Sequence, residues 1–216
     1  MNIIKLKDFY LAKTILQNLR FLLVLAFLTL SLSTMLAQTT AKRALLVIDV
    51  QENLVNPNSK IHMDTAGINL FFNKINQTIS TFDQKSDLVV YIVNEWTNPI
   101  MNWGTGNVCK KGAPGVGLDS RLKQVNQYVF SKSKPNSLTN QELLKLLKDN
   151  QITEVYVVGL LAEGCIKATV LGLQDEEFQP IVISDVIGSK NRGNYLKVME
   201  YFEKNGIKMV QAQDIR

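Results

Sequence analysis

The residues best suited to covalent chemistry in this sequence lie within one stretch, residues 155–178, which reads VYVVGLLAEGCIKATVLGLQDEEF. Its first seven residues form an apolar, β-branched run, typical of a strand that is buried on both faces. After a tight turn, Cys165 enters the first turn of an expected helix, where the helix dipole and unpaired backbone amides favour a reactive thiolate. A small buried core cysteine fits this local pattern equally well, so the rest of the chain must decide.

Two further reactive side chains end apolar segments that we expect to be strands. Asp49 ends one such run in ALLVIDV, and Lys132 ends NQYVFSK. Ligands of open parallel sheets bind outside the carboxyl ends of the strands, which predicts that both residues approach Cys165. A carboxylate can accept the thiol proton and an ammonium can stabilise a thiolate. For either residue alone, a chain leaving the core is an equally good explanation; together the three predict nucleophilic catalysis without histidine.

The composition argues against several other kinds of site. The chain has one histidine, His62, and two cysteines, Cys109 and Cys165, and it contains no CxxC, HxxxH or HExxH pattern. We therefore expect no metal and no cofactor. The net charge of +5 is not concentrated in a basic run interleaved with aromatic residues, so no nucleic-acid partner is expected. A thiol-redox protein that uses Cys109 with Cys165 stays an alternative.

The first 38 residues have the pattern of a targeting segment. Several basic residues precede the apolar run FLLVLAFLTLSLSTMLA at residues 21–37. This predicts a signal peptide, or alternatively an uncleaved membrane anchor, and places the domain outside the cytoplasmic membrane, secreted or periplasmic. Contact with a membrane is expected only through this segment if it is uncleaved. Residues 39–216 would form a single domain.

From Arg43 onward, expected strands and helices alternate. A helical pattern covers residues 68–82, a second strand ends near Asn94, and the irregular stretch 97–117 is expected to be a functional or mobile loop. Thr139 is the expected N-cap of the next helix. The final elements are a strand ending near Asp185, a helix over 194–205 and a last short strand. This alternation predicts an α/β fold, a three-layer α/β/α sandwich with a mostly parallel six-stranded sheet.

Four segments of the chain resemble one known family. ALLVIDVQENLV, VFSKSKPNSLTNQELLKLL, the stretch 155–178 and IVISDVIGS are similar, in this order, to the Rossmann-like isochorismatase-like cysteine hydrolases, which include nicotinamidases and N-carbamoyl amidohydrolases. The resemblance covers Arg43 to the C-terminus. It implies a catalytic triad of Asp49, Lys132 and Cys165, a non-proline cis peptide at Leu161–Ala162, and an oxyanion hole formed by the amides of Ala162 and Cys165.

Two departures from the family narrow the expected reaction. Metal-containing nicotinamidases carry an aspartate and histidines near the pocket, which a chain with a single histidine cannot supply. True isochorismatases cleave a vinyl ether and lack the cysteine nucleophile. The resemblance therefore implies a metal-independent hydrolase of a small amide, ureido or related C–N bond that forms a thioester acyl-enzyme.

Four residues are candidates for binding the small-molecule substrate because they follow a strand end or lie in the long loop: Gln51, Asn94, Trp96 and Trp103. A vinyl-ether hydrolase and a non-catalytic binding protein that keeps the fold are the alternative functions. A homo-oligomer is compatible with the sequence.

Overall fold

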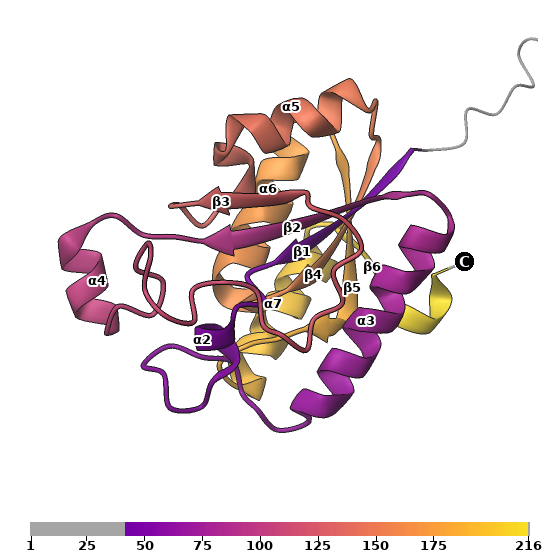
Figure 1. The fold of residues 1–216 in the computed structure, drawn as a ribbon. Helices are drawn as coiled ribbons and strands as arrows, with labels where there is room; N and C mark the ends of the chain where they lie inside the picture. Colours follow the sequence, from indigo (N-terminus) through magenta and orange to yellow (C-terminus); the bar gives the residue numbers. More distant parts are fainter. Residues whose placement is uncertain (1–41, 216) are drawn as a thin grey trace, which may run out of the picture. The chain divides into compact units, whose positions relative to one another are not determined.

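The computed structural model describes residues 42–215, so the predicted signal peptide or anchor lies outside the described residues (Figure 1). The described residues belong to one compact unit, residues 41–216. Within residues 42–215, no helix combines the length and apolar character that crossing a membrane requires.

The centre of the domain is a six-stranded sheet in which every pair of neighbouring strands is parallel. The spatial order is β3-β2-β1-β4-β5-β6, so the direction of winding reverses between β1 and β4. This confirms the predicted parallel α/β sheet. The strands are β1 (Arg43–Ile48), β2 (Leu88–Asn94), β3 (Val129–Lys132), β4 (Glu154–Gly159), β5 (Gln179–Ile187) and β6 (Lys208–Val210).

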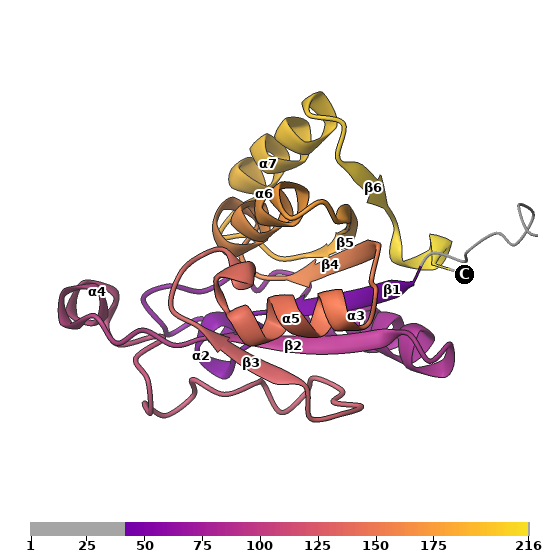
Figure 2. The ribbon, with the colours of Figure 1, turned by 90° about the horizontal axis from the view of Figure 1, so that it is seen from above.

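Helices connect the strands and cover both faces of the sheet, which confirms the three-layer prediction (Figures 1 and 2). Residues of α3 pack on one face, whereas residues of α5, α6 and α7 belong to the core on the other. Figure 2 shows α6 next to β5, and α7 lies on the far side of α6 and contacts β6. The helices are α2 (Glu52–Val55), α3 (Ile68–Gln84), α4 (Pro99–Thr105), α5 (Gln141–Asp149), α6 (Lys167–Asp175) and α7 (Arg192–Lys204).

Strand β1 shows why an apolar run of this kind forms a central strand. Leu45 and Val47 belong to the core beneath α3, while Leu46 and Ile48 belong to the core on the opposite face. Successive side chains of a strand point to opposite faces, and both faces are covered by helices here, so every position is apolar. The strand is buried along almost its whole length.

Two local predictions differ from the structure. The N-cap of α5 is Asn140, whose Oδ1 accepts hydrogen bonds from the amides of Glu142 and Leu143 at 2.9 and 3.0 Å. Thr139 instead ends a 3-10 turn and donates to the carbonyl oxygen of Asn136. The stretch 97–117, expected to be a functional or mobile loop, contains the short helix α4, which Asn98 caps with its side chain.

Strands β1 and β4 approach each other closely at the end that carries the predicted nucleophile turn. Gly159 has φ +115, and a Cβ atom there would lie 2.0 Å from the carbonyl oxygen of Ile48. Only glycine permits both this backbone conformation and this approach. The residues that follow, Asp49 on one side and the turn after β4 on the other, are therefore brought together at the point where the winding reverses, where open α/β sheets bind ligands.

Candidate active site

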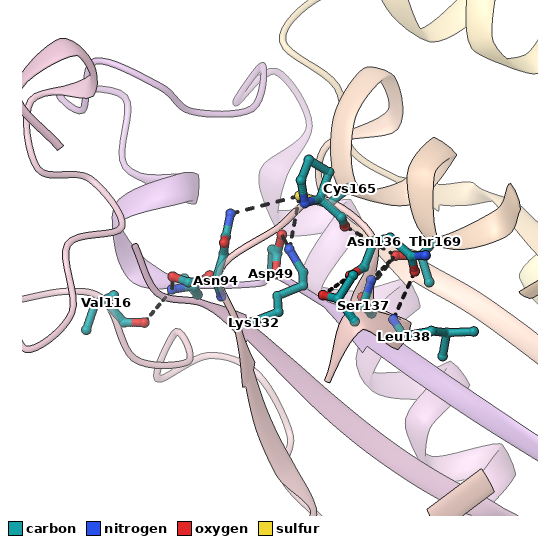
Figure 3. Close-up of polar contacts among 12 residues, drawn as sticks. Asp49, Asn94, Val116, Lys132, Asn136, Ser137, Leu138, Cys165 and Thr169 are labelled. Carbon is teal, nitrogen blue, oxygen red and sulfur yellow. Dashed lines mark hydrogen bonds and ion pairs between the residues drawn. The ribbon is translucent and has the colours of Figure 1, made fainter. Parts of the chain in front are cut away.

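The side chains of Asp49, Lys132 and Cys165 meet at the carboxyl edge of the sheet (Figure 3). The Lys132 Nζ donates to Asp49 Oδ2 at 2.8 Å and to Cys165 Sγ at 3.1 Å. The charge of Asp49 also acts on the thiol of Cys165. The structure thus brings a carboxyl group, an amine and a thiol together from three separate strand ends.

Lys132 reaches this cluster from the edge of the sheet. Strand β3 is the outermost strand, and its last residue, Lys132, pairs with Asn94 at the end of β2. Because β2 lies between β3 and β1, the side chain must extend past the end of β2 to reach Asp49. The Lys132 and Asp49 side chains are 0% and 1% exposed. Such a buried ion pair is tolerated only when its hydrogen bonds are well made, which favours a functional role for it.

The nucleophile turn has a conformation that its sequence did not reveal. Residues 162–166 form a π-helical turn ahead of α6, and the cis peptide bond joins Leu160 and Leu161. The prediction of a cis bond at Leu161–Ala162 is therefore wrong by one residue. The amide of Ala162 donates to the carbonyl oxygen of Gly188 at 2.8 Å. This bond attaches the turn to the segment after β5, so the Ala162 amide is occupied by a backbone carbonyl oxygen in this structure, and its place in an oxyanion hole stays a prediction.

Burial controls the protonation states of the cluster. Burial, and secondarily the nearby charge of Asp49, raises the pKa of the Cys165 thiol to about 12, against the lowering influence of Lys132. The expected resting thiolate is thus replaced by a thiol, because desolvation outweighs the helix terminus and the lysine. Burial also raises the pKa of Asp49, with Lys132 opposing it.

Lys132 remains a cation in this setting. Burial acts to lower its pKa, but the charges of Asp49 and Cys165 and their hydrogen bonds raise it above the ordinary value. A low-dielectric site with one fixed ammonium accommodates one negative charge far better than two. The cluster therefore holds one proton that Asp49 and Cys165 can exchange.

Gln51 lies beside the site, and its side chain is held by backbone groups. It is 0% exposed, and its side-chain nitrogen donates to the carbonyl oxygens of Asn94 and Val116, while its oxygen accepts from the Asn94 amide at 2.7 Å. These contacts join the chain after β1 to the end of β2 and to the long loop. Gln51 therefore braces the site in this structure, and its contact with substrate stays a prediction.

Of the other residues predicted to bind substrate, Asn94 lies beside the Cys165 thiol, whereas Trp96 and Trp103 differ from each other in burial. The Asn94 side-chain nitrogen lies 3.9 Å from Cys165 Sγ. Trp96 is partly buried and packs against the core beneath α3, and its amide donates to the Cys109 carbonyl oxygen. Trp103 is 84% exposed on α4. The structure does not place Trp103 in a pocket wall, because the long loop forms a helix that turns this side chain to solvent.

Two acceptors of the site have no hydrogen-bond partner among the described protein atoms. They are Asp49 Oδ1 and Asn94 Oδ1, each buried. An unsatisfied buried acceptor is costly, and such groups are typically satisfied by water or a ligand. The residue types alone could not have shown this, since it depends on which oxygen Lys132 leaves free.

A separate cavity lies beside the segment that follows β5. Its volume is about 390 Å³, and its lining includes Met63, Asp185, Ser189 and Tyr195 but not Asp49, Lys132 or Cys165. Among residues 42–215, no group of three or more His, Cys, Asp or Glu side chains is arranged to hold a metal ion, and both cysteines are free. We therefore derive no step through a metal.

The fold resembles those of several solved structures. A pyrazinamidase of Pyrococcus horikoshii in complex with zinc is 22% identical, with a TM-score of 0.69 and coverage of 79% of this chain and 99% of that chain. A cysteine hydrolase from Pseudomonas syringae pv. phaseolicola 1448A is 13% identical (TM-score 0.72, coverage 81% and 90%). A nicotinamidase from Bacillus subtilis is 19% identical (TM-score 0.67, coverage 79% and 99%). At these identities the likeness establishes the fold alone.

A search of curated proteins finds no match to this chain. The model of the isochorismatase domain matches residues 43–214, from the first residue of β1 to the end of the last 3-10 turn. The match therefore spans the whole sheet and every strand end that contributes to the cluster. The chain belongs to the isochorismatase-like hydrolase family.

Proposed function

We propose that this hydrolase cleaves the C–N bond of a small primary amide or terminal ureido group, with Cys165 as nucleophile and Asp49 as the proton carrier. The observation that carries the proposal is the position of Lys132 Nζ, within 2.8 Å of Asp49 Oδ2 and 3.1 Å of Cys165 Sγ. One cation in contact with both groups stabilises the negative charge on whichever of them holds it.

In the first half of the reaction, Asp49 accepts the Cys165 proton as Sγ attacks the substrate carbonyl carbon. The raised thiol pKa means that the thiolate forms only as Asp49 takes its proton. The tetrahedral oxyanion is stabilised by the backbone amide of Cys165, a preorganised donor beside the reacting carbon. When the C–N bond breaks, Asp49 returns the proton to the departing nitrogen.

In the second half, water releases the acyl group from Cys165. Asp49, now ionised again, takes a proton from the attacking water, the thioester C–S bond breaks, and the proton returns to the Cys165 sulfur. Lys132 keeps its charge throughout, since its raised pKa holds the proton on Nζ. The products are a carboxylic or carbamic acid and the released amine or ammonia.

The unpartnered acceptors favour a substrate that carries N–H donors at the reacting group. Asp49 Oδ1 and Asn94 Oδ1 are both buried beside the nucleophile. An –NH2 leaving group can donate to them, which orients the scissile bond and satisfies two otherwise costly acceptors. A vinyl ether offers no such donor, so this observation supports the amide over the vinyl-ether alternative.

The test is a substrate panel of primary amides, terminal ureides and vinyl ethers, assayed with wild type, Cys165→Ala and, as the matched control, Cys109→Ala. We expect turnover of a member of the first two classes, reduced at least about 10³-fold by Cys165→Ala and unchanged by Cys109→Ala. A thioester adduct at Cys165 in quenched reactions would support the covalent route. Activity that survives Cys165→Ala would exclude it, and turnover confined to vinyl ethers would exclude the amide.

We further propose that the enzyme is exported, on the basis of the basic and apolar pattern of residues 1–38. Mass spectrometry of the protein recovered from its native cell would identify the mature N-terminus and its compartment. Export is supported if the chain is recovered outside the cytoplasmic membrane and begins near residue 38. A chain that retains Met1 and sediments with membranes would favour the anchor, and a cytosolic chain would contradict both.

A further inference from the structure

The turn that contains Cys165 also contains a carboxylate, Glu163, that takes no part in the proposed reaction. Glu163 lies two residues before Cys165 in the π-helical turn Ala162–Ile166. Both of its oxygens accept hydrogen bonds: Oε2 from Ser189 Oγ at 2.7 Å, and Oε1 from Asn194 Nδ2 at 3.0 Å and from the Lys190 amide at 3.2 Å. A single side chain therefore ties the turn to the segment after β5 and to the first turn of α7.

The same segment contacts the turn in two other ways. The carbonyl oxygen of Gly188 accepts from the Ala162 amide at 2.8 Å, and a Cβ atom at Gly188 would lie 2.3 Å from Leu160 Cδ2. The residues on either side of Cys165 thus have different partners: those before it are attached to residues 188–194, whereas the thiol itself contacts Lys132. Residues two apart in a helical turn do not face each other, so Glu163 acts from behind the nucleophile.

The surroundings of Glu163 favour the charged form of its carboxyl group. Burial acts to raise the pKa of Glu163, but its own backbone amide and the donors from Ser189, Asn194 and Lys190 together bring it below its usual value. A carboxylate that accepts several hydrogen bonds is held in its charged form, and charge-assisted hydrogen bonds are the stronger kind.

We propose that Glu163 is a positioning residue that holds Cys165 against Asp49 and Lys132 by attaching the nucleophile turn to Ser189 and Asn194. The expected loss of turnover rests on the proposed function. The expected change in the reactivity of the Cys165 thiol does not. Without this attachment, the turn relaxes toward solvent and Sγ loses its contact with Lys132. A displacement of up to about 1 Å in a reacting group reduces the rate on the order of 10–100-fold.

The test compares Glu163→Ala, Glu163→Gln, Ser189→Ala and Asn194→Ala with Asp185→Asn as the matched control. Asp185 is also a partly buried carboxylate with two donors, Lys74 Nζ and the Ala212 amide, but it ties β5 to elements that do not carry Cys165. Each variant is assayed for kcat and KM, for thermal unfolding, and for the alkylation rate of Cys165 by iodoacetamide, read by mass spectrometry.

We expect opposite changes in the two rates. Glu163→Ala should lower kcat on the order of 10–100-fold with little change in KM, and should accelerate alkylation about tenfold, because a released thiol regains a more ordinary pKa. Glu163→Gln keeps one acceptor and should be intermediate, as should Ser189→Ala and Asn194→Ala. Asp185→Asn should lower the melting temperature without changing either rate.

The alkylation measurement separates this inference from the proposed function, since it requires no substrate. If no amide is turned over but alkylation accelerates in the Glu163, Ser189 and Asn194 variants and not in Asp185→Asn, the positioning role stands and the proposed function fails. If alkylation and kcat in the Glu163, Ser189 and Asn194 variants match wild type, or if Asp185→Asn changes them equally, the positioning role is overturned. Should Glu163→Ala fail to fold, the two partner substitutions decide the question in its place.

Discussion

The two cysteines of this chain lie in similar electrostatic surroundings but in different local structures. For both, burial and the charge of Asp49 raise the thiol pKa to about 12, while Lys132 acts to lower it. Cys165 receives a hydrogen bond from Lys132 Nζ and sits in a helical turn at the end of β4, whereas Cys109 is fully buried in the long loop. The thiol pKa therefore does not distinguish the proposed nucleophile from Cys109, whereas the hydrogen bond from Lys132 does.

The turn around Cys165 and the loop around Cys109 also differ in how their backbones are held in place. The turn around Cys165 is braced by Gly159 against β1 and by Glu163 against α7. The loop around Cys109 is held mainly by backbone hydrogen bonds, such as that from Trp96 to the Cys109 carbonyl oxygen. A braced turn keeps one reacting atom in register with its partners, which is what covalent catalysis requires.

The largest expected effect is on turnover when the partners of Cys165 are removed. Asp49→Asn cannot accept the thiol proton, and Lys132→Met leaves the negative charge without its cation. Each substitution should lower kcat on the order of 10²–10⁴-fold, measured on the substrate found in the panel. Cys109→Ser, which alters the other thiol, should stay within about twofold of wild type. Equal losses in all three variants would show that the two cysteines are not functionally distinct.

The second prediction concerns the reactivity of the two thiols in the folded wild type. Cys165 is partly exposed and should react with iodoacetamide first, whereas Cys109 is 0% exposed and requires local opening of the core. If opening costs about 3 kcal/mol, Cys109 should react about 100-fold more slowly. Peptide mapping by mass spectrometry at several times measures both rates. Faster labelling of Cys109 would contradict the described burial.

The third prediction compares one glycine from each region. Gly159→Ala places a Cβ atom 2.0 Å from the Ile48 carbonyl oxygen and should destabilise the fold by about 3 kcal/mol or more. Gly112, close to Cys109, also has a positive φ of 76°, but nothing lies within 4 Å of its Cβ position. Gly112→Ala should therefore cost only about 1–2 kcal/mol. Urea unfolding of both variants gives the difference, and equal costs would argue against the close approach of β1 and β4.

The smallest expected effect is the pH dependence. Burial raises the pKa of Asp49, and the base must be ionised to act, so kcat/KM should fall as the pH drops through this raised pKa. The acid limb should lie above the ordinary carboxyl range of about 4, with a loss of about tenfold per pH unit. Lys132→Met should move the limb to still higher pH in any residual activity, because the lysine charge lowers the Asp49 pKa. Cys109→Ala should leave the profile in place.

The sequence by itself determined the layer architecture and the identity of the trio. Apolar runs such as ALLVIDV, alternating with helical patterns, indicate a parallel sheet covered on both faces, and strand ends place Asp49 and Lys132 on one edge. These inferences succeeded because hydrophobic periodicity and the polarity of strand ends are local properties of the chain.

Only the tertiary structure decided how the site is held together. Lys132 lies on the outermost strand, and nothing in its own segment shows that it extends past β2 to reach Asp49. The attachment of the Ala162 amide to Gly188 and the bracing contacts of Gln51 and Glu163 all depend on residues more than twenty positions away. The pKa of Cys165 was misjudged for the same reason, because desolvation is set by what the whole fold packs around the thiol.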